Sequence, residues 1–481
     1  MVFSSLLFVF AFLASNIVLH RLMPTVKGKN IIMLCFSLIF YAWGGPKYII
    51  LLLSMVFICW FFALRIEKCS GTRGKKVWLF FGCALTLGIL GYFKYAVFFA
   101  ENLKALTGFP ESLPNIVLPI GISFYTFQLL SYVVDVYRGQ VVAQKKYWLL
   151  LLYASLFHQC IAGPIVRYKD VRQDILYRKV ALPELSDGIR RFTVGLAKKA
   201  VLANTCAMLA DTMLPITGNL ASASVLAIVA GSACYMLEIY LDFSAYSDMA
   251  IGMGLMVGFH YNENFNYPYI AGTITDFWRR WHISLSTFFR DYVYIPLGGN
   301  RCKVWRHILN MLIVWFLTGM WHGASWNFIL WGLYYFVFLV IEKYIFSKIK
   351  LADCLKIPAA VVRHGYVVAV VFFGWILFRF TELDVVVTVV KGLFGLNGNS
   401  LIDGSTQILL KNHMFFLIFA VIAVVPLGKK IRETMLEKAS VNPYVCTILN
   451  VFEILLPPVL LILSLMALVG DSYNPFLYFQ F

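Results

Sequence analysis

Two of the eight histidines lie in contexts that suit acid–base chemistry, and the first of these is His322. It follows basic Arg306 by about 15 residues, which places it roughly 22 Å along a helix and well inside a membrane. A buried neutral imidazole suits general-base work, since its ordinary pKa lies near 6.5 and burial lowers it. The residues alone slightly favour the alternative, a packed histidine that bridges two helices.

Small and aromatic residues surround this histidine. Gly319 and Gly323 allow close backbone approach, and Trp321 and Trp326 are expected to wall a pocket. Such a pocket would exclude water from a reactive group.

His282 lies in a segment, 276–286, that mixes two arginines with three aromatic residues. Guanidinium groups pair with phosphates and stack on rings, so Arg279 and Arg280 are candidates to hold a nucleotide-like cofactor at the cytoplasmic face. The stronger interpretation from the residues alone is an interfacial helix that contacts lipid head groups. Two nearby carboxylates, Asp242 and Asp248, are expected to pair with one of these arginines rather than to do acid–base chemistry.

The last six residues contain four aromatic side chains, a composition typical of a membrane-interface anchor. A second interpretation is that the hydroxyl of Tyr478 is nucleophilic. A phenol with a pKa near 10 would then need a base such as His322.

The elements that position these residues are membrane helices. Of the 481 residues, 60% are hydrophobic and 14% are charged, which excludes a soluble globular or disordered protein. We therefore predict one all-α polytopic domain over residues 1–481, with no separate soluble domain. Apolar stretches suggest about twelve spans near 1–20, 31–46, 48–65, 77–97, 116–134, 193–212, 223–241, 307–323, 325–341, 364–380, 411–428 and 446–470.

The formal net charge of +17 comes from basic residues between apolar runs, a positive-inside pattern rather than a nucleic-acid footprint. The pattern predicts that both termini lie outside and that residues 1–20 form a retained helix rather than a cleaved signal peptide. The ten cysteines show no pairing or histidine spacing suited to a disulfide framework or a metal site.

The apolar run 147–166 is predicted to dip into the membrane and return, because it has basic flanks on both sides and Gly163-Pro164 near its end. Broken backbone at membrane depth requires surrounding protein or water, so a re-entrant run here implies an internal cavity. The segment 242–306 is also rich in arginine and is expected to be cytoplasmic or re-entrant for the same reason.

Together these motifs resemble the membrane-bound O-acyltransferase family, and within it the bacterial branch that acts in alginate O-acetylation and teichoic acid D-alanylation. The similar core runs from about 118 to 340. The matching stretches are 118–128, 135–139, 161–165, 242–248, 277–300 and 321–323.

The resemblance implies a ring of helices with re-entrant segments around a tunnel open from both faces. It makes His322 the active-site histidine and His282 the second signature position, so both are expected to be catalytic. It further implies a thioester donor from the cytoplasm, typically acetyl-coenzyme A, and no bound cofactor. The expected donor-binding residues are Arg279, Arg280, Trp321 and Trp326. The expected location is the inner membrane of a bacterial cell, with membrane lipid and an exported glycan acceptor as partners.

The tail, residues 471–481, is similar to the tyrosine-containing motif of a small peptide of the D-alanylation system, in which the tyrosine is thought to carry the acyl group. That similarity implies a relay through Tyr478 to an extracytoplasmic esterase-like (SGNH-type) partner. His158 and Ala245 depart from the family's usual Pro and Gly, which leaves acceptor and donor details open, and His158 is best interpreted as a core residue. The alternatives are D-alanyl or long-chain acyl transfer, and non-catalytic transport of a donor or glycan.

Overall fold

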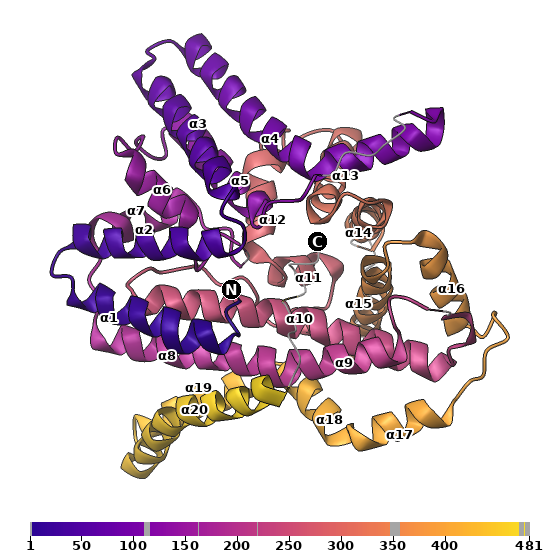
Figure 1. Ribbon diagram of the computed structural model, residues 1–481. Coiled ribbons are helices and arrows are strands. Elements are labelled where there is room, and N and C mark those ends of the chain that lie inside the picture. The colour runs from indigo at the N-terminus through magenta and orange to yellow at the C-terminus, as the bar shows by residue number, and fades with distance from the viewer. Residues whose placement is uncertain are drawn as a thin grey trace. The chain divides into compact units, whose positions relative to one another are not determined.

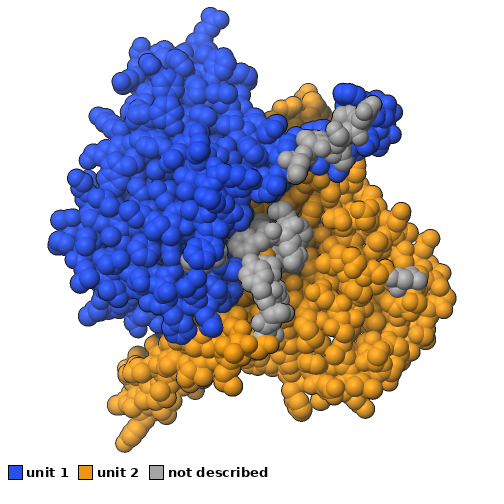
Figure 2. Space-filling model, viewed as in Figure 1, with its two compact units in different colours: residues 1–192, 246–263, 284–296 blue, residues 193–245, 264–283, 297–481 orange. Residues whose placement is uncertain are grey.

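The computed structural model describes residues 2–109, 116–161, 163–218, 220–346, 356–470 and residue 476. Throughout these residues the regular structure is helical, with no strand (Figure 1). The chain forms two compact units, drawn in different colours in Figure 2. The all-α prediction is therefore confirmed.

Unit 1 comprises residues 1–192, 246–263 and 284–296. Its long pair of helices, α3 and α4, packs side by side, and α5 packs against both (Figure 1). The unit also contains the first part of α8, the last turns of α10, most of α12 and all of η5. The elements up to α8 are η1 Leu7–Leu13, α1 Ala14–Leu22, α2 Val26–Trp43, α3 Tyr48–Lys68, α4 Thr72–Thr107, α5 Ile122–Tyr137, α6 Tyr147–Ser155, α7 Tyr168–Tyr177 and α8 Leu182–Ala197.

Unit 2 comprises residues 193–245, 264–283 and 297–481. Within it α13 packs closely on α14, α14 on α15, and α19 on α20. The remaining elements of the chain are η2 Lys198–Ala203, α9 Asn204–Met213, η3 Leu220–Ser222, α10 Val225–Met256, η4 Pro268–Ile270, α11 Ile274–Arg280, α12 Ile283–Phe289, η5 Arg290–Tyr294, α13 Val304–His322, α14 Trp326–Tyr344, α15 Lys356–Arg379, α16 Leu383–Leu393, α17 Gly404–Asn412, α18 Met414–Ala423, α19 Leu427–Ala439 and α20 Pro443–Gly470.

Six helices of the described residues are long and apolar enough to cross a membrane, or seven if the bent pair α17–α18 forms one span. They are Val26–Trp43, Tyr48–Lys68, Thr72–Thr107, Val225–Met256, Ala359–Arg379 and Pro443–Gly470. Several of the twelve predicted stretches are interrupted rather than continuous helices. The stretch near 193–212 passes through the π-helical segment η2, and α17 meets α18 at an angle of 64°.

The run 147–166 is not a continuous spanning helix. Its helix, α6, stops at Ser155 after nine residues, and the chain from residue 156 to 161 is buried but not helical. Nine residues of helix rise only about 14 Å, less than half of a bilayer's hydrocarbon core. Gly121 packs against this non-helical chain with a φ of +74°, and a Cβ there would lie 2.3 Å from the Cys160 carbonyl oxygen.

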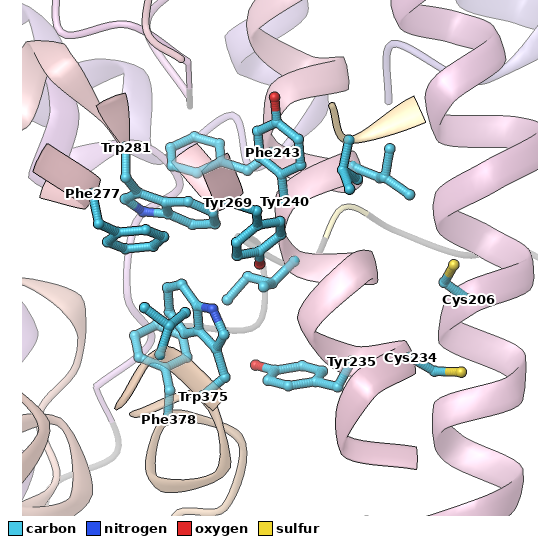
Figure 3. Close-up of a cluster of buried hydrophobic side chains, with 14 of the residues drawn as sticks. Cys206, Cys234, Tyr235, Tyr240, Phe243, Tyr269, Phe277, Trp281, Trp375 and Phe378 are labelled. Carbon is cyan, nitrogen blue, oxygen red and sulfur yellow. The ribbon is translucent and has the colours of Figure 1, made fainter. Parts of the chain in front are cut away.

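The core of unit 2 is an unusually aromatic cluster (Figure 3). Its rings come from α10, η4, α11, α14 and α15 and from Trp281 directly after α11. Tyr240 meets Tyr269 edge to face and Phe277 stacks on Trp281, arrangements favoured by the ring quadrupoles. Trp281 lies at the centre, 4.8 Å from the Trp375 ring and 5.7 Å from the Phe277 ring. The two candidate histidines border this cluster.

Candidate active site

His322 is the last residue of α13, and its side chain is buried at 7% exposure. Three aromatic rings surround the imidazole. The centroid distances are 5.0 Å to Trp321, 4.9 Å to Trp331 of α14 and 5.2 Å to Phe378 of α15. Apolar walls of this kind exclude water from the ring.

Glycines allow the α13–α14 crossing that places His322 in this enclosure. A Cβ on Gly319 would lie 2.4 Å from the Phe328 carbonyl oxygen, and one on Gly323 would lie 2.2 Å from the Phe328 ring. On α14, a Cβ on Gly332 would lie 2.3 Å from the Trp315 carbonyl oxygen of α13. The glycines beside His322 are therefore required by close helix packing, as their positions in the sequence suggested.

His282 lies between α11 and α12 and is fully buried. Its φ of +44° is rare for a residue with a side chain, and such strain tends to occur at functional sites. Two backbone hydrogen bonds hold it in place. Ile283 N donates to Asn264 O over 2.9 Å, and Asn266 N donates to Arg280 O over 2.9 Å.

The side chain of Asn264 orients the imidazole of His282. The Asn264 Oδ1 lies 3.2 Å from His282 Nδ1, and because an amide oxygen accepts, Nδ1 carries the proton and Nε2 holds the lone pair. Burial lowers the pKa of His282 well below its ordinary value, so the ring is neutral near pH 7. Asn264 was not predicted from the sequence, since it lies 18 residues before its partner.

The two histidines contact the same indole. The Trp321 ring lies 5.7 Å from the His282 ring and 5.0 Å from the His322 ring. On its other side His282 meets Phe243 at 4.8 Å. The structure thus brings together two residues that are 40 positions apart in the sequence. Among the described residues, no three His, Cys, Asp or Glu side chains meet in a group that could hold a metal ion.

The remaining predicted donor-binding residues lie at more open positions. Arg279 is exposed, and Arg280 Nε is 3.0 Å from both carboxylate oxygens of Asp276. Trp326 begins α14 and is 52% exposed, whereas the α14 indole beside His322 belongs to Trp331. Trp331 and Phe378 were missed, because nothing local in the sequence indicates which rings of α14 and α15 face α13.

The carboxylates of α10 are paired as predicted, but with other partners. Asp242 Oδ1 lies 2.6 Å from Lys199 Nζ, and Asp248 Oδ1 lies 2.7 Å from Arg191 Nε. The predicted pairing with Arg279 or Arg280 is wrong, since both observed partners come from the helical stretch 182–203 that precedes α10.

His158 is a core residue, as predicted. It is fully buried, and its Nδ1 lies 3.1 Å from the Tyr261 hydroxyl. The predicted acyl carrier, Tyr478, lies outside the described residues. Of the tail only Phe476 is described, and it is 1% exposed.

Glu342 of α14 caps the helix that leads to His282. Its carboxylate accepts hydrogen bonds from Ile274 N at 2.5 Å, Thr275 N at 3.0 Å and Thr275 Oγ1 at 2.9 Å. A carboxylate at a helix N-terminus satisfies backbone donors that the helix leaves unpaired. The same helix, α14, therefore contacts His322 near its start and holds α11 near its end.

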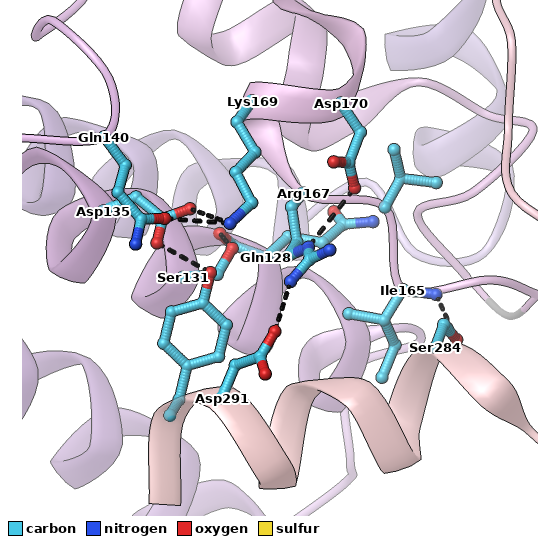
Figure 4. A network of polar contacts seen from close by, with 12 residues as sticks. Gln128, Ser131, Asp135, Gln140, Ile165, Arg167, Lys169, Asp170, Ser284 and Asp291 are labelled. Atoms are coloured by element: carbon cyan, nitrogen blue, oxygen red, sulfur yellow. Dashed lines mark hydrogen bonds and ion pairs between the residues drawn. The ribbon is translucent and has the colours of Figure 1, made fainter. Parts of the chain in front are cut away.

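A separate polar network lies within unit 1 (Figure 4). The Tyr292 hydroxyl donates to Asp135 Oδ1 over 2.8 Å, and Lys169 Nζ lies 3.8 Å from Asp135 Oδ2. Arg167 Nη1 donates to Asp291 Oδ2 over 2.8 Å. These contacts pair the basic residues after the run 147–166 with the carboxylates of α5 and η5.

Comparison with known proteins places these features in a family. The sequence profile of MBOAT, the membrane-bound O-acyltransferase family, matches residues 48–381. The probable alginate O-acetylase AlgI of Azotobacter vinelandii is 36% identical over 514 residues, covering 100% of both chains. The peptidoglycan O-acetyltransferase of Helicobacter pylori is 34% identical, covering 83% of this chain and 81% of its own. The teichoic acid D-alanyltransferase of Bacillus subtilis is 30% identical, covering 47% and 59%.

Proposed function

Because the chain belongs to the membrane-bound O-acyltransferase family and is therefore a multi-pass membrane O-acyltransferase, we propose that it acetylates an exported or cell-wall polysaccharide, with His322 as the active-site base. One observation carries the assignment of the site. Both signature histidines are buried and contact the same indole ring, that of Trp321. The acceptor class comes from relatives named for O-acetylation of alginate and of peptidoglycan.

The proposed reaction is acyl transfer from a thioester to a hydroxyl. His322 accepts the proton of the attacking hydroxyl as its oxygen bonds to the thioester carbonyl carbon. The carbon–sulfur bond then breaks, and the thiolate leaves and takes up that proton. The enclosing rings of Trp321 and Trp331 keep water from competing for the thioester.

The other signature residues have supporting roles in this scheme. The neutral His282, oriented by Asn264 and in contact with Trp321, acts beside the reacting carbonyl. The donor is acetyl-coenzyme A or a similar thioester that enters from the cytoplasm, and Arg279 and Arg280 hold its phosphates. The exposure of Arg279 suits contact with such a ligand.

The wider architecture follows the same proposal. The helices form a ring of about twelve crossings with re-entrant segments and a central tunnel, embedded in the inner membrane. The acyl group passes through the tunnel to Tyr478, and an extracytoplasmic esterase-like partner moves it to the glycan. D-alanyl transfer is the second candidate, because a named D-alanyltransferase matches about half of the chain.

The first test replaces His322 with Ala in cells whose polysaccharide acetylation depends on this protein. We expect acetylation to be lost while the amount of protein in the membrane stays normal. His260→Ala is the matched control, because its side chain is 55% exposed and pairs with Asp174 at 3.4 Å. Retained acetylation in the His322→Ala variant would reject its role as base.

The second test identifies the acyl carrier. The purified protein is incubated with isotopically labelled acetyl-coenzyme A and analysed by peptide mass spectrometry, alongside His322→Ala and Tyr478→Phe. Label on the carboxyl-terminal peptide that disappears in both variants supports the relay. Full transfer activity of Tyr478→Phe would reject Tyr478 as carrier and leave direct transfer to the acceptor.

A further inference from the structure

A buried ion pair in unit 2 lies outside the site described above. Lys199 of η2 and Asp242 of α10 are 2.6 Å apart, and each side chain is 3% exposed. Removing two charges from water costs several kcal/mol per ion, and hydrophobic residues of similar size are often at least as stable. Stability alone therefore gives little reason for this pair.

The aromatic ring of Phe476 covers the ammonium group of Lys199. Lys199 Nζ lies 4.8 Å from the centre of that ring, within the range of a cation–π interaction. Phe476 belongs to the tail after α20, and it is 1% exposed. An aromatic residue six positions beyond the last helix is thus buried on a charge that the helical core supplies.

The preceding helix brings the tail to this place. α20 packs against η2, the π-helical segment that carries Lys199. The carboxylate of Asp242 lies 2.6 Å from Lys199 Nζ. Because the ring of Phe476 lies over the same ammonium group, the site combines an ion pair with a cation–π contact.

We propose that Lys199 and Asp242 form a docking site for the carboxyl-terminal tail, with Phe476 as its anchor. Lys199, Asp242 and Phe476 are then positioning residues. Their consequence for catalysis rests on the proposed function, in which Tyr478, two residues after the anchor, carries the acyl group. Docking itself does not depend on that role.

The test measures protection of the tail in the full-length protein in detergent, by hydrogen exchange of the peptide 471–481. Phe476→Leu keeps an apolar side chain but removes the ring, and Phe476→Trp keeps a ring. We expect exchange of the tail to rise about tenfold in the leucine variant, within the range of a desolvated cation–π contact, and to stay near the original rate in the tryptophan variant.

Variants on the docking side separate specific recognition from loss of folding. Lys199→Met combined with Asp242→Asn removes both charges without leaving one buried alone, so the unit remains folded while the tail is released. Lys199→Arg keeps a cation and is expected to retain protection. Unchanged protection of the tail in the double variant would overturn the proposal.

Labelling with acetyl-coenzyme A distinguishes this proposal from the carrier role of Tyr478. If the original protein is unlabelled but its tail is released in the variants, the relay fails and docking stands. If the original protein is labelled and Phe476→Leu retains both the label and the protection, docking fails and the relay stands.

Discussion

Replacing Gly319 with Ala tests whether close packing of α13 on α14 positions His322. The added Cβ would lie 2.4 Å from the Phe328 carbonyl oxygen, about 1 Å closer than ordinary van der Waals contact. The obstructing atom belongs to the backbone, so no side-chain rotation can relieve the clash and the two helices must separate. Gly365→Ala on α15 is the matched control, since a Cβ there meets nothing within 4 Å.

The two variants are expected to differ in stability. Both glycines lie in helices, so each Ala contributes about 0.5–1 kcal/mol, whereas the overpacking cost of about 1–3 kcal/mol falls on Gly319 alone. The free energies of unfolding should therefore differ by about 1–3 kcal/mol, with Gly319→Ala the less stable. Denaturant unfolding in detergent, followed by tryptophan fluorescence, measures this difference.

Activity provides the second readout for the same pair. Separation of the helices moves His322 away from Trp331, and a shift of 1 Å in a catalytic group can cost about a hundredfold in rate. Folded Gly319→Ala should therefore transfer acetyl groups at least about tenfold more slowly than Gly365→Ala. Equal stability and equal activity of the two variants would refute the packing argument.

Two further variants test the contacts that hold His282. Glu342→Ala leaves three hydrogen-bond donors of α11 without their acceptor and should cost about 2–3 kcal/mol in the free energy of unfolding. The control Glu433→Ala breaks only an exposed ion pair and should cost less than about 0.5 kcal/mol. Equal losses in the two variants would contradict the capping role of Glu342. Asn264→Ala removes the hydrogen-bond acceptor of His282 Nδ1 and should lower kcat for acetyl transfer about ten- to a hundredfold, as loss of an orienting hydrogen bond does in other sites. Asn264→Asp retains an acceptor and should keep more of the rate. Unchanged kcat in both variants would reject the orienting role of Asn264. A third variant, Gly121→Ala, places a side chain at a positive φ and against the Cys160 carbonyl oxygen, so it should lower the midpoint temperature of thermal unfolding. An unchanged midpoint would show that the chain after α6 can move aside.

The sequence alone determined the class of protein and predicted where the site lies. High hydropathy and few charges require membrane helices whatever their arrangement, and the Trp-His-Gly motif predicted His322 as the base at the end of a helix. Gly163-Pro164 and the flanking basic residues indicated that the run 147–166 does not continue as a helix. These features are local in the sequence, so they can be recognised without knowledge of the tertiary structure.

The tertiary structure decided which residues meet. Asp242 pairs with Lys199, and the rings around His322 come from Trp331 and Phe378, none of which the local sequence indicates. Hydropathy also records how apolar a stretch is and not where a π-turn or a bend interrupts it, as η2 and the α17–α18 junction do. Charge pairing and ring contacts depend on how helices distant in sequence approach one another, and that approach is set by glycines and side-chain volumes across the whole core.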